Sequence, residues 1–375
     1  MTQVALIVAG PTASGKSALA LALAERIGGT VINADSMQVY RELRILTARP
    51  TPAEEATVPH ALYGVRPARE PGSAAWWRDA ALAAMDAARA AGRVPLLCGG
   101  TGLYFSSLID GLSPIPPVSD EVRQAARALL KSIGPAALHA RLAAVDPATA
   151  ARLRPTDSQR VARAWEVWCS SGRGLASWQS EQAAPPASSS PVPPRPPAAS
   201  RSPSASGSPS ASGSPAASGS PAESGSAAAS ASPAAPGSPA ASRSPEAFRA
   251  VLLDPPREVL REAIEQRFGA MLAAGAMSEV QALLDQGLDP ALPAMRAHGV
   301  PELAAHLRGE ISIEEAARRA RLVTGQYAKR QATWFRHHAL AEPGAVHMIH
   351  ARFTGLTQFS ERERGELLNF IDAPA

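Results

Sequence analysis

The chain has 375 residues, of which 45% are hydrophobic, and a formal net charge of +4 at pH 7. This length allows two or three domains, and the small positive charge permits a polyanionic partner without requiring one. Its two cysteines, Cys98 and Cys169, form no C-x-x-C motif, which argues for reduced thiols and against a zinc site. The first apolar run, Val4 to Ala9, is too short for a secretion signal or a membrane span, so we expect a cytoplasmic protein without a membrane partner.

The first strong signal along the chain is a phosphate-binding sequence. The apolar run has the character of a buried parallel strand and leads directly into a G-x-x-x-x-G-K-S motif. A helical pattern follows from Ala18 to Ile27, so the motif lies at a strand-to-helix turn, where backbone N–H groups bind anions. In such a turn Lys16 reaches the outer phosphate and the Ser17 hydroxyl ligates Mg²⁺. The residues predicted to form this phosphate site are Gly10, Pro11, Thr12, Ala13, Ser14, Gly15, Lys16 and Ser17.

Two later strands carry polar residues where they end, at the edge of a parallel sheet where ligands bind. A strand at 30–34 is followed by Asp35, which fits either a general base or an aspartate that caps a turn. A strand at 94–98 ends in Gly99-Gly-Thr-Gly102 rather than in the aspartate that holds Mg²⁺ in nucleotide hydrolases. These glycines allow a ligand to approach the backbone closely, or simply form a tight turn, and Thr101 places a hydroxyl there. The sequence therefore predicts phosphate binding without the usual hydrolytic apparatus.

The middle of the chain divides into two stretches of different composition. An α/β core begins over 1–115, with helices expected at 16–27 and 74–91, and a helical insertion subdomain follows over 116–180. Its helices are expected at 119–132, 135–144, 147–153 and 157–170. Residues 181–246 are nearly all Pro, Ala, Ser and Gly and contain a tandem hexapeptide from Ser202 to Gly225. Such a segment buries too little apolar surface to offset its chain entropy, so we expect disorder, and repeat expansion in a surface loop is favoured over a partner-docking tail.

After this insert, residues 247–350 are expected to complete the core, and 351–375 to form a C-terminal tail. A strand is expected at 250–254, and Arg257, at the start of the next helix, would clamp a phosphate oxygen. The further elements are expected as helices at 256–274, 276–286, 299–307 and 312–337, a strand at 345–350 and a helix near 359–371.

The helix expected at 313–336 has two opposed faces. Its apolar stripe consists of Ile313, Ala316, Ala320, Val323, Tyr327 and Trp334. The opposite side carries Arg318, Arg321, Lys329 and Arg336. Because few acidic residues follow Glu315, we expect these cations not to be paired off along the helix and to suit a phosphate backbone, with an ordinary solvated face as the alternative.

Six motifs together carry a family resemblance: Gly10-Pro-Thr-Ala-Ser-Gly-Lys-Ser17, Asp35-Ser-Met-Gln-Val-Tyr40, Thr47-Ala-Arg-Pro50, Gly99-Gly-Thr-Gly-Leu-Tyr104, Asp157-Ser-Gln-Arg160 and Lys329-Arg-Gln-Ala-Thr-Trp334. With them the chain resembles the tRNA dimethylallyltransferases, or isopentenyl-diphosphate:tRNA transferases, over nearly all of its length except the insert and the tail. The resemblance implies a P-loop NTPase-like α/β fold, a parallel sheet flanked by helices, with an inserted all-helical tRNA-binding subdomain. We also expect a monomer.

The activity implied by the resemblance is transfer of a dimethylallyl group from dimethylallyl diphosphate to N6 of the adenosine 3′ of the anticodon, giving N6-isopentenyladenosine in tRNA. The phosphate loop would hold the diphosphate, Asp35 would accept the proton of the amine, and Thr101, Arg257 and Mg²⁺ on Ser17 would stabilise the leaving group. The target base would be flipped out of the anticodon stem-loop. The residues implied in tRNA contact are Asp35, Ser36, Met37, Gln38, Thr101, Arg123, Gln159, Arg160, Val161, Ala162, Arg163, Arg296, Gly299, Lys329, Arg330, Gln331 and Arg336.

The sequence departs from the family at one of these segments. Some members read Arg-x-x-Gly-Tyr-Arg where this chain has Arg296, Gly299 and then Val300-Pro301, without the aromatic and basic pair. Three other functions share part of the pattern: a small-molecule kinase using ATP, an isopentenyltransferase acting on free adenine nucleotides, and an RNA-binding module without activity. The kinase leaves the basic helix unexplained, the second leaves the tRNA-facing segments unexplained, and the third leaves the phosphate loop unused.

Overall fold

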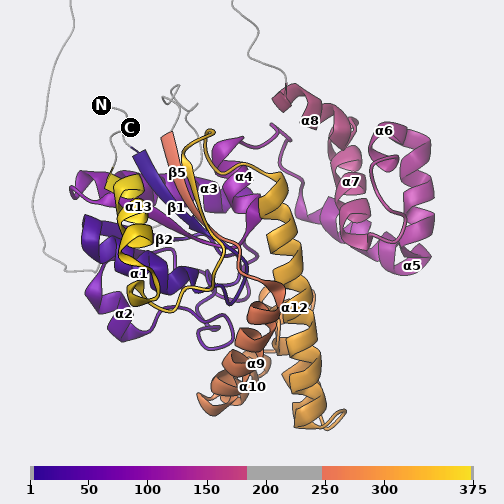
Figure 1. Cartoon of the computed structure of the whole chain (residues 1–375). Coiled ribbons are helices and arrows are strands. Elements are labelled where there is room, and N and C mark those ends of the chain that lie inside the picture. The colour runs from indigo at the N-terminus through magenta and orange to yellow at the C-terminus, as the bar shows by residue number, and fades with distance from the viewer. Residues whose placement is uncertain (1–3, 184–246, 373–375) are drawn as a thin grey trace, which may run out of the picture. The chain divides into compact units, whose positions relative to one another are not determined.

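The structure is a computed structural model that describes residues 4–183 and 247–372. Six parallel strands form one sheet in the order β3-β2-β4-β1-β5-β6. The strands are β1 Val4–Ala9, β2 Gly29–Asn33, β3 His60–Ala61, β4 Val94–Gly99, β5 Ala247–Leu253 and β6 Val346–Ile349. The expected α/β fold with a parallel sheet flanked by helices is therefore confirmed (Figure 1). The predicted disorder of the insert lies outside the described residues, except for 181–183, which end a helix.

The helices agree with most of the expected segments. They are α1 Lys16–Ile27, α2 Pro52–Thr57, α3 Ala74–Ala90, α4 Gly102–Ile109, α5 Asp120–Val145, α6 Pro147–Ala150, α7 Ser158–Ser171, α8 Leu175–Ala183, α9 Arg257–Ala273, α10 Ala276–Leu284, α11 Val300–Leu307, α12 Ile313–His337 and α13 Glu361–Asp372. The sequence interpretation missed α2, β3, α4 and α8, which are short. Among the described residues no helix is both long enough and apolar enough to cross a membrane.

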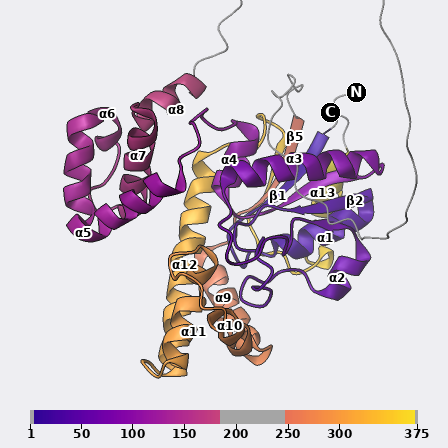
Figure 2. The same ribbon diagram turned by 180° about the vertical axis from the view of Figure 1, so that it is seen from behind.

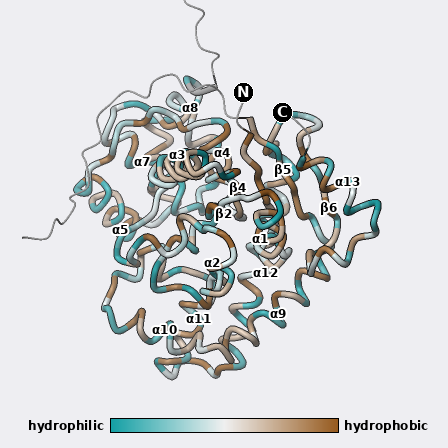
Figure 3. Tube along the Cα trace, turned by 90° about the vertical axis from the view of Figure 1, so that its left-hand side faces the viewer, coloured by the Kyte–Doolittle hydropathy of each residue, from teal (hydrophilic) through white to brown (hydrophobic). Residues whose placement is uncertain are grey.

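Alternate residues of each inner strand face opposite layers of helices, because side chains on a strand have a period of two. Along β1, Leu6 and Val8 pack with α1 and α13, whereas Ala5, Ile7 and Ala9 belong to the cluster that contains α3, α4 and α12. Figure 2 shows α3 and α4 on the face away from α1 and α13, and Figure 3 shows the largely hydrophobic colour of the strands. Burial on both faces explains why β1 and β4 read as continuous apolar runs.

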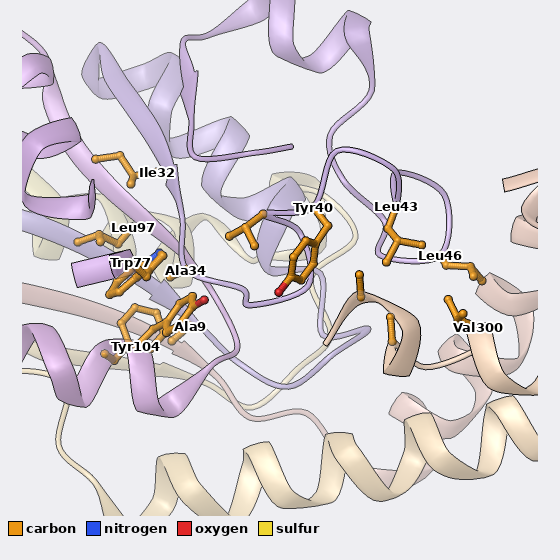
Figure 4. Packing of buried hydrophobic residues seen from close by; sticks show 14 of the residues in the cluster. Ala9, Ile32, Ala34, Tyr40, Leu43, Leu46, Trp77, Leu97, Tyr104 and Val300 are labelled. Carbon is orange, nitrogen blue, oxygen red and sulfur yellow. The ribbon is translucent and has the colours of Figure 1, made fainter. Parts of the chain in front are cut away.

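The larger cluster extends from the sheet to the helices that follow it in the chain. Trp77 of α3 stacks on Tyr104 of α4 with ring centroids 4.4 Å apart, and its indole N–H donates to the backbone of Asn33 at the end of β2. Figure 4 follows this cluster from the sheet to Leu46, which lies beside Val300 of α11. The loop after β2 is therefore packed against the helices of the C-terminal half of the chain.

The segment expected as a C-terminal tail packs on the sheet. Leu367 of α13 and Phe353 before it are 1% and 3% exposed and belong to the smaller core cluster with α1. The Arg249 guanidinium of β5 donates to the backbone carbonyl of Phe370 at 2.6 Å. This C-terminal segment is thus part of the α/β core.

The helical subdomain has a small core of its own. Leu142 of α5, Ala150 of α6 and Ala164 of α7 are buried together. The two helices expected at 119–132 and 135–144 form one element, α5, that is interrupted at Gly134, where φ is 77° and ψ is 167°. Pro135 follows, and a proline at the first position of a new helical turn loses no hydrogen bond.

Replacing Gly134 by alanine should lower the free energy of unfolding by about 1–3 kcal/mol, because its backbone lies in a region that is essentially restricted to glycine. No atom lies within 4 Å of a Cβ added there, so the loss would come from the backbone alone. In the matched control Gly269→Ala, an exposed helical glycine of α9 with equally free space, alanine should stabilise by up to about 1 kcal/mol. Urea unfolding followed by circular dichroism measures both, and effects of the same sign would contradict this explanation.

Candidate active site

The phosphate loop joins β1 to α1 in a conformation that suits anion binding. Ala13 and Gly15 have positive φ values of 66° and 90°, and α1 begins at Lys16. A Cβ at Gly15 would lie 2.1 Å from the carbonyl oxygen of Phe353, so only glycine fits there. The Lys16 side chain is buried, and its ammonium makes one long contact of 3.5 Å to the Pro11 carbonyl. Burial lowers the pKa of Lys16, and the nearby Asp35 opposes this shift.

Two arginines from distant parts of the chain hold this loop. Arg267 of α9 donates to the Thr12 hydroxyl at 2.9 Å, and Arg352, which follows β6, donates to the Ala13 carbonyl at 3.1 Å. Burial lowers the pKa of Arg267, Asp35 opposes this shift, and the charge of Arg352 adds to it. Three cationic side chains therefore surround the phosphate loop, with Asp35 facing two of them, Lys16 and Arg267.

Arg257, the arginine predicted for this role, is not among the residues that line the pocket. Arg257 is exposed in the first turn of α9, and Arg267, further along the same helix, lines the pocket instead. A sequence signal for Arg267 was present, because it interrupts the buried stripe of α9 formed by Ile264, Phe268 and Met271. A charged residue at a buried helical position is rare unless it has a partner.

Asp35 is held at the end of β2 by hydrogen bonds to backbone groups. The Asn33 amide accepts from the Asp35 N–H at 2.8 Å and donates to its carbonyl at 3.0 Å. One Asp35 carboxylate oxygen accepts from the Met37 N–H at 2.9 Å, while the carboxylate lines the pocket. The Thr101 hydroxyl accepts from the Ser36 N–H at 2.9 Å, so the two residues predicted as catalytic come from adjacent, hydrogen-bonded segments.

The glycine turn after β4 accommodates protein atoms, not the ligand suggested by its sequence. A Cβ at Gly99 would lie 2.1 Å from the Ala34 carbonyl oxygen, and one at Gly102 would lie 2.3 Å from the Trp334 ring of α12. A Cβ at Gly100 would lie 2.2 Å from the side-chain nitrogen of Gln331. These glycines therefore let α12 and the end of β2 approach the sheet closely, and Thr101 is fixed between them.

One pocket brings the phosphate loop, Asp35 and α12 together. It leaves about 610 Å³ free of protein atoms, open solvent at its mouth included. Burial and the Arg330 guanidinium lower the pKa of His298 in its wall, so this imidazole is neutral at pH 7. Burial raises the pKa of Tyr327, which hydrogen-bonds Thr101. The pocket is lined by Thr12, Asp35, Met37, Leu46, Thr47, Ile264, Arg267, Phe268, Met271, Ala297, His298, Thr324 and Tyr327.

A carboxylate of α10 fixes the loop that forms one side of this pocket. Glu279 accepts hydrogen bonds from three successive backbone N–H groups, those of Arg44, Ile45 and Leu46, at 2.7, 2.7 and 2.9 Å. Gln38 holds the same loop from the other end, since its amide donates to the carbonyls of Thr47 and Ala48 at 2.8 and 3.0 Å.

Several residues predicted to contact tRNA have buried side chains and serve the protein interior. Val161 and Ala162 lie on the buried face of α7, at 0% and 7% exposed. Gly299 is buried because Leu46 covers it, with a Cβ there only 2.9 Å from the Leu46 side chain. Gln38 and Gln331 are also buried, so these side chains are not available on the surface. The residues with exposed side chains are Gln159, Arg160, Arg163, Arg296, Lys329, Arg330 and Arg336, while Ser36, Met37 and Arg123 are half-buried.

Of the four cations predicted on the polar face of α12, one is paired along the helix and two are paired with carboxylates elsewhere in the chain. Arg318 pairs with Glu315 on the same helix, whereas Arg321 pairs with Glu265 of α9. Arg336 binds both carboxylate oxygens of Asp254, at 3.0 and 3.1 Å. Lys329 and Arg330 have no carboxylate partner among the residues that the structure describes, and the Arg330 guanidinium lies 5.6 Å from the Tyr327 ring centroid.

The residues near Ser17 offer few protein ligands for a metal. Within residues 4–183 and 247–372, no cluster of three or more His, Cys, Asp or Glu side chains could hold an ion. At the end of β4, burial raises the pKa of Cys98 to about 11, so its thiol is neutral, and the Ser17 side chain hydrogen-bonds it. Mg²⁺ usually keeps several waters and binds substrate phosphates, so a single hydroxyl fits an ion that is carried by a diphosphate.

Comparisons with protein families and curated proteins agree on one family. A model described as IPP transferase matches residues 38–196 and 221–338, and one described as isopentenyl transferase matches residues 2–60. The tRNA dimethylallyltransferase of Granulibacter bethesdensis is 53% identical over 98% of each chain. That of Gluconobacter oxydans is 52% identical over 98% of this chain and 93% of its own.

Solved structures share the architecture. The tRNA isopentenylpyrophosphate transferase of Bacillus halodurans is 27% identical, with a TM-score of 0.59 over 98% of this chain and 95% of its own. A eukaryotic dimethylallyltransferase acting on tRNA has a TM-score of 0.69 at 20% identity, over 100% of this chain and 80% of its own, and supports the fold alone.

Arg267→Gln should weaken the binding of inorganic diphosphate with Mg²⁺ by roughly tenfold or more, the loss expected for a hydrogen bond to a charged group. The matched control is Arg257→Gln on the same helix, which should leave the affinity unchanged because Arg257 is exposed and does not line the pocket. Isothermal titration calorimetry measures both affinities. A larger loss for Arg257→Gln would restore the sequence-based assignment and contradict the placement of Arg267.

Proposed function

Because this chain belongs to the IPP transferase family, we propose that it transfers a dimethylallyl group from dimethylallyl diphosphate to N6 of the adenosine 3′ of the anticodon in tRNA, giving N6-isopentenyladenosine. The observation that carries the proposal is the placement of the Asp35 carboxylate and the cationic phosphate loop on one pocket. A base on one side and an anion site on the other suit an alkyl transfer with a diphosphate leaving group.

In the reaction, the N6 nitrogen attacks C1 of the dimethylallyl group while the bond from C1 to the diphosphate oxygen breaks. Asp35 accepts the proton that N6 loses, and its hydrogen bond from the Met37 N–H orients the carboxylate. Thr101 lies beside Asp35 through Ser36, whose backbone N–H donates to the Thr101 hydroxyl. Asp35 is the one carboxylate among the described residues that line the pocket.

The departing diphosphate carries negative charge, which oriented donors at the phosphate loop stabilise. The phosphate loop supplies backbone N–H groups, Lys16 an ammonium and Arg267 a guanidinium. Mg²⁺ would be held by the Ser17 hydroxyl and the diphosphate and would supply further neutralisation of its charge.

The acceptor base reaches the pocket only if it leaves its stack, as in other enzymes that modify a base. Lys329 and Arg330 on α12 and the exposed arginines of α7 are the candidate contacts to the anticodon stem-loop. The proposal includes a monomer that acts in the cytoplasm.

One incubation separates this function from its alternatives: the protein with Mg²⁺, labelled dimethylallyl diphosphate and either bulk tRNA or AMP. Label in tRNA supports the proposal, and label in AMP alone would favour an enzyme acting on free nucleotides. Label in neither acceptor would overturn prenyl transfer.

Asp35→Asn should reduce the single-turnover rate of transfer by about 10²- to 10⁴-fold, the range expected for the loss of a general base. The asparagine keeps an oxygen that accepts from the Met37 N–H, so the turn should survive. The affinity for tRNA, measured by filter binding, should change by less than about twofold. A parallel loss of tRNA affinity or a lower melting temperature would mean that Asp35 acts mainly as a turn residue.

Lys329→Ala should weaken tRNA binding and reduce the slope of log K against log salt concentration by about one, since a phosphate contact is lost. Arg318→Ala on the same helix is the control, because the Arg318 guanidinium is already paired with Glu315 at 2.7 Å. Filter binding at several salt concentrations measures the slope. An equal change in both variants would show that the helix attracts RNA through its overall charge rather than through Lys329.

A further inference from the structure

Gln331 is a buried side chain of α12, 4% exposed, whose amide connects two segments of the active site. Its Oε1 atom accepts from the backbone N–H of Thr12 in the phosphate loop at 2.8 Å. Its Nε2 atom donates to the carbonyl of Gly100 in the glycine turn at 2.7 Å. One amide group thus spans the gap between the segment that would hold the leaving group and the segment that carries Thr101.

We infer that Gln331 is a positioning residue that fixes the phosphate loop relative to Asp35 and Thr101. The inference rests on the proposed function for its kinetic consequence, but not for its geometry. Both polar ends of the amide are occupied by protein groups, so the side chain has no surface to offer to RNA. This differs from the tRNA contact that the sequence predicted for Gln331.

Other hydrogen bonds hold the same two segments, the phosphate loop and the glycine turn. Gln331 accepts from the backbone N–H of Thr12, and Arg267 donates to the hydroxyl of the same Thr12. Tyr327, one turn before Gln331 on α12, hydrogen-bonds both Thr101 and Gln331. A change in the Gln331 amide therefore shifts the diphosphate site relative to Asp35 and Thr101, without removing any group that touches substrate.

The shape of the glycine turn supports the same conclusion. A Cβ at Gly100 would lie 2.2 Å from Nε2 of Gln331, so the absence of a side chain at Gly100 is what admits the amide. Alanine at Gly100 should displace Gln331 from the opposite side. Two substitutions on different elements are thus expected to break the same bridge.

Gln331→Met keeps the length of the side chain and removes both hydrogen bonds. The single-turnover rate of transfer should fall by roughly 100-fold, the loss that a misplacement of about 1 Å causes, with the KM for dimethylallyl diphosphate and the Kd for tRNA within about threefold of wild type. Gly100→Ala should reproduce this split between rate and binding. The double variant should be little slower than either single variant, because both substitutions remove one interaction.

The control is Phe335→Leu, a buried residue of α12 that packs against Phe105 and does not contact the phosphate loop. It should lower the melting temperature while the transfer rate at 25 °C stays near wild type. A wild-type rate for Gln331→Met would overturn the inference. So would a loss of diphosphate and tRNA affinity together with a lower melting temperature, since this is the result of a merely structural role.

Hydrogen exchange keeps this inference separate from the proposed function. The Thr12 amide should be protected from exchange in the wild-type protein. In Gln331→Met it should exchange at least about tenfold faster, because the hydrogen bond that protects it is lost. Failure of the wild-type protein to transfer label would overturn the proposed function only. A Thr12 amide that exchanges equally fast in both proteins would overturn the bridge.

Discussion

Parallel pairing of β1, β2 and β4 determines where every group of the site lies. Ala9 pairs with Gly99, and Asn33 pairs with Cys98, so the three strands end at the same level of the sheet. The phosphate loop, Asp35 and the glycine turn follow directly from these ends and meet there, as expected for ligand sites in open parallel sheets. The Ala34 carbonyl approaches Gly99 so closely that a side chain at Gly99 would separate β2 from β4.

Charge balance explains why this edge of the sheet needs an anion. Burial lowers the pKa values of Lys16 and Arg267, which means that the protein interior disfavours their charged forms. Asp35 compensates one charge, and Arg352 adds another of the same sign. A bound diphosphate would supply the missing negative charge, so the substrate itself would complete the electrostatics of the site.

The sequence predicted those parts of the structure that depend on local pattern. The apolar runs of β1 and β4, the phosphate loop and the position of Asp35 could be read because each is defined by adjacent residues. Adjacent residues could not decide whether Arg257 or Arg267 is the arginine of the site, because the answer depends on which face of α9 meets the phosphate loop. The ion pairs of Arg321 with Glu265 and of Arg336 with Asp254 were missed for the same reason, since both partners lie on other elements. The resemblance placed Gln331 among the tRNA contacts, whereas its place on the buried face of α12 decides the contacts it makes in the structure.

The same contacts explain how a phosphate loop can serve transfer rather than hydrolysis. Nucleotide hydrolases hold Mg²⁺ with an aspartate at the end of a strand beside the loop, and at the end of β4 this chain has the neutral thiol of Cys98 instead. Gln331 and Trp334 of α12 fill the space beside the glycine turn. In the proposed reaction Asp35 accepts the proton, so the substrate atom that reaches it is the one that reacts. The packing of α12 on the glycine turn thus fixes how the phosphate loop lies relative to Asp35 and Thr101.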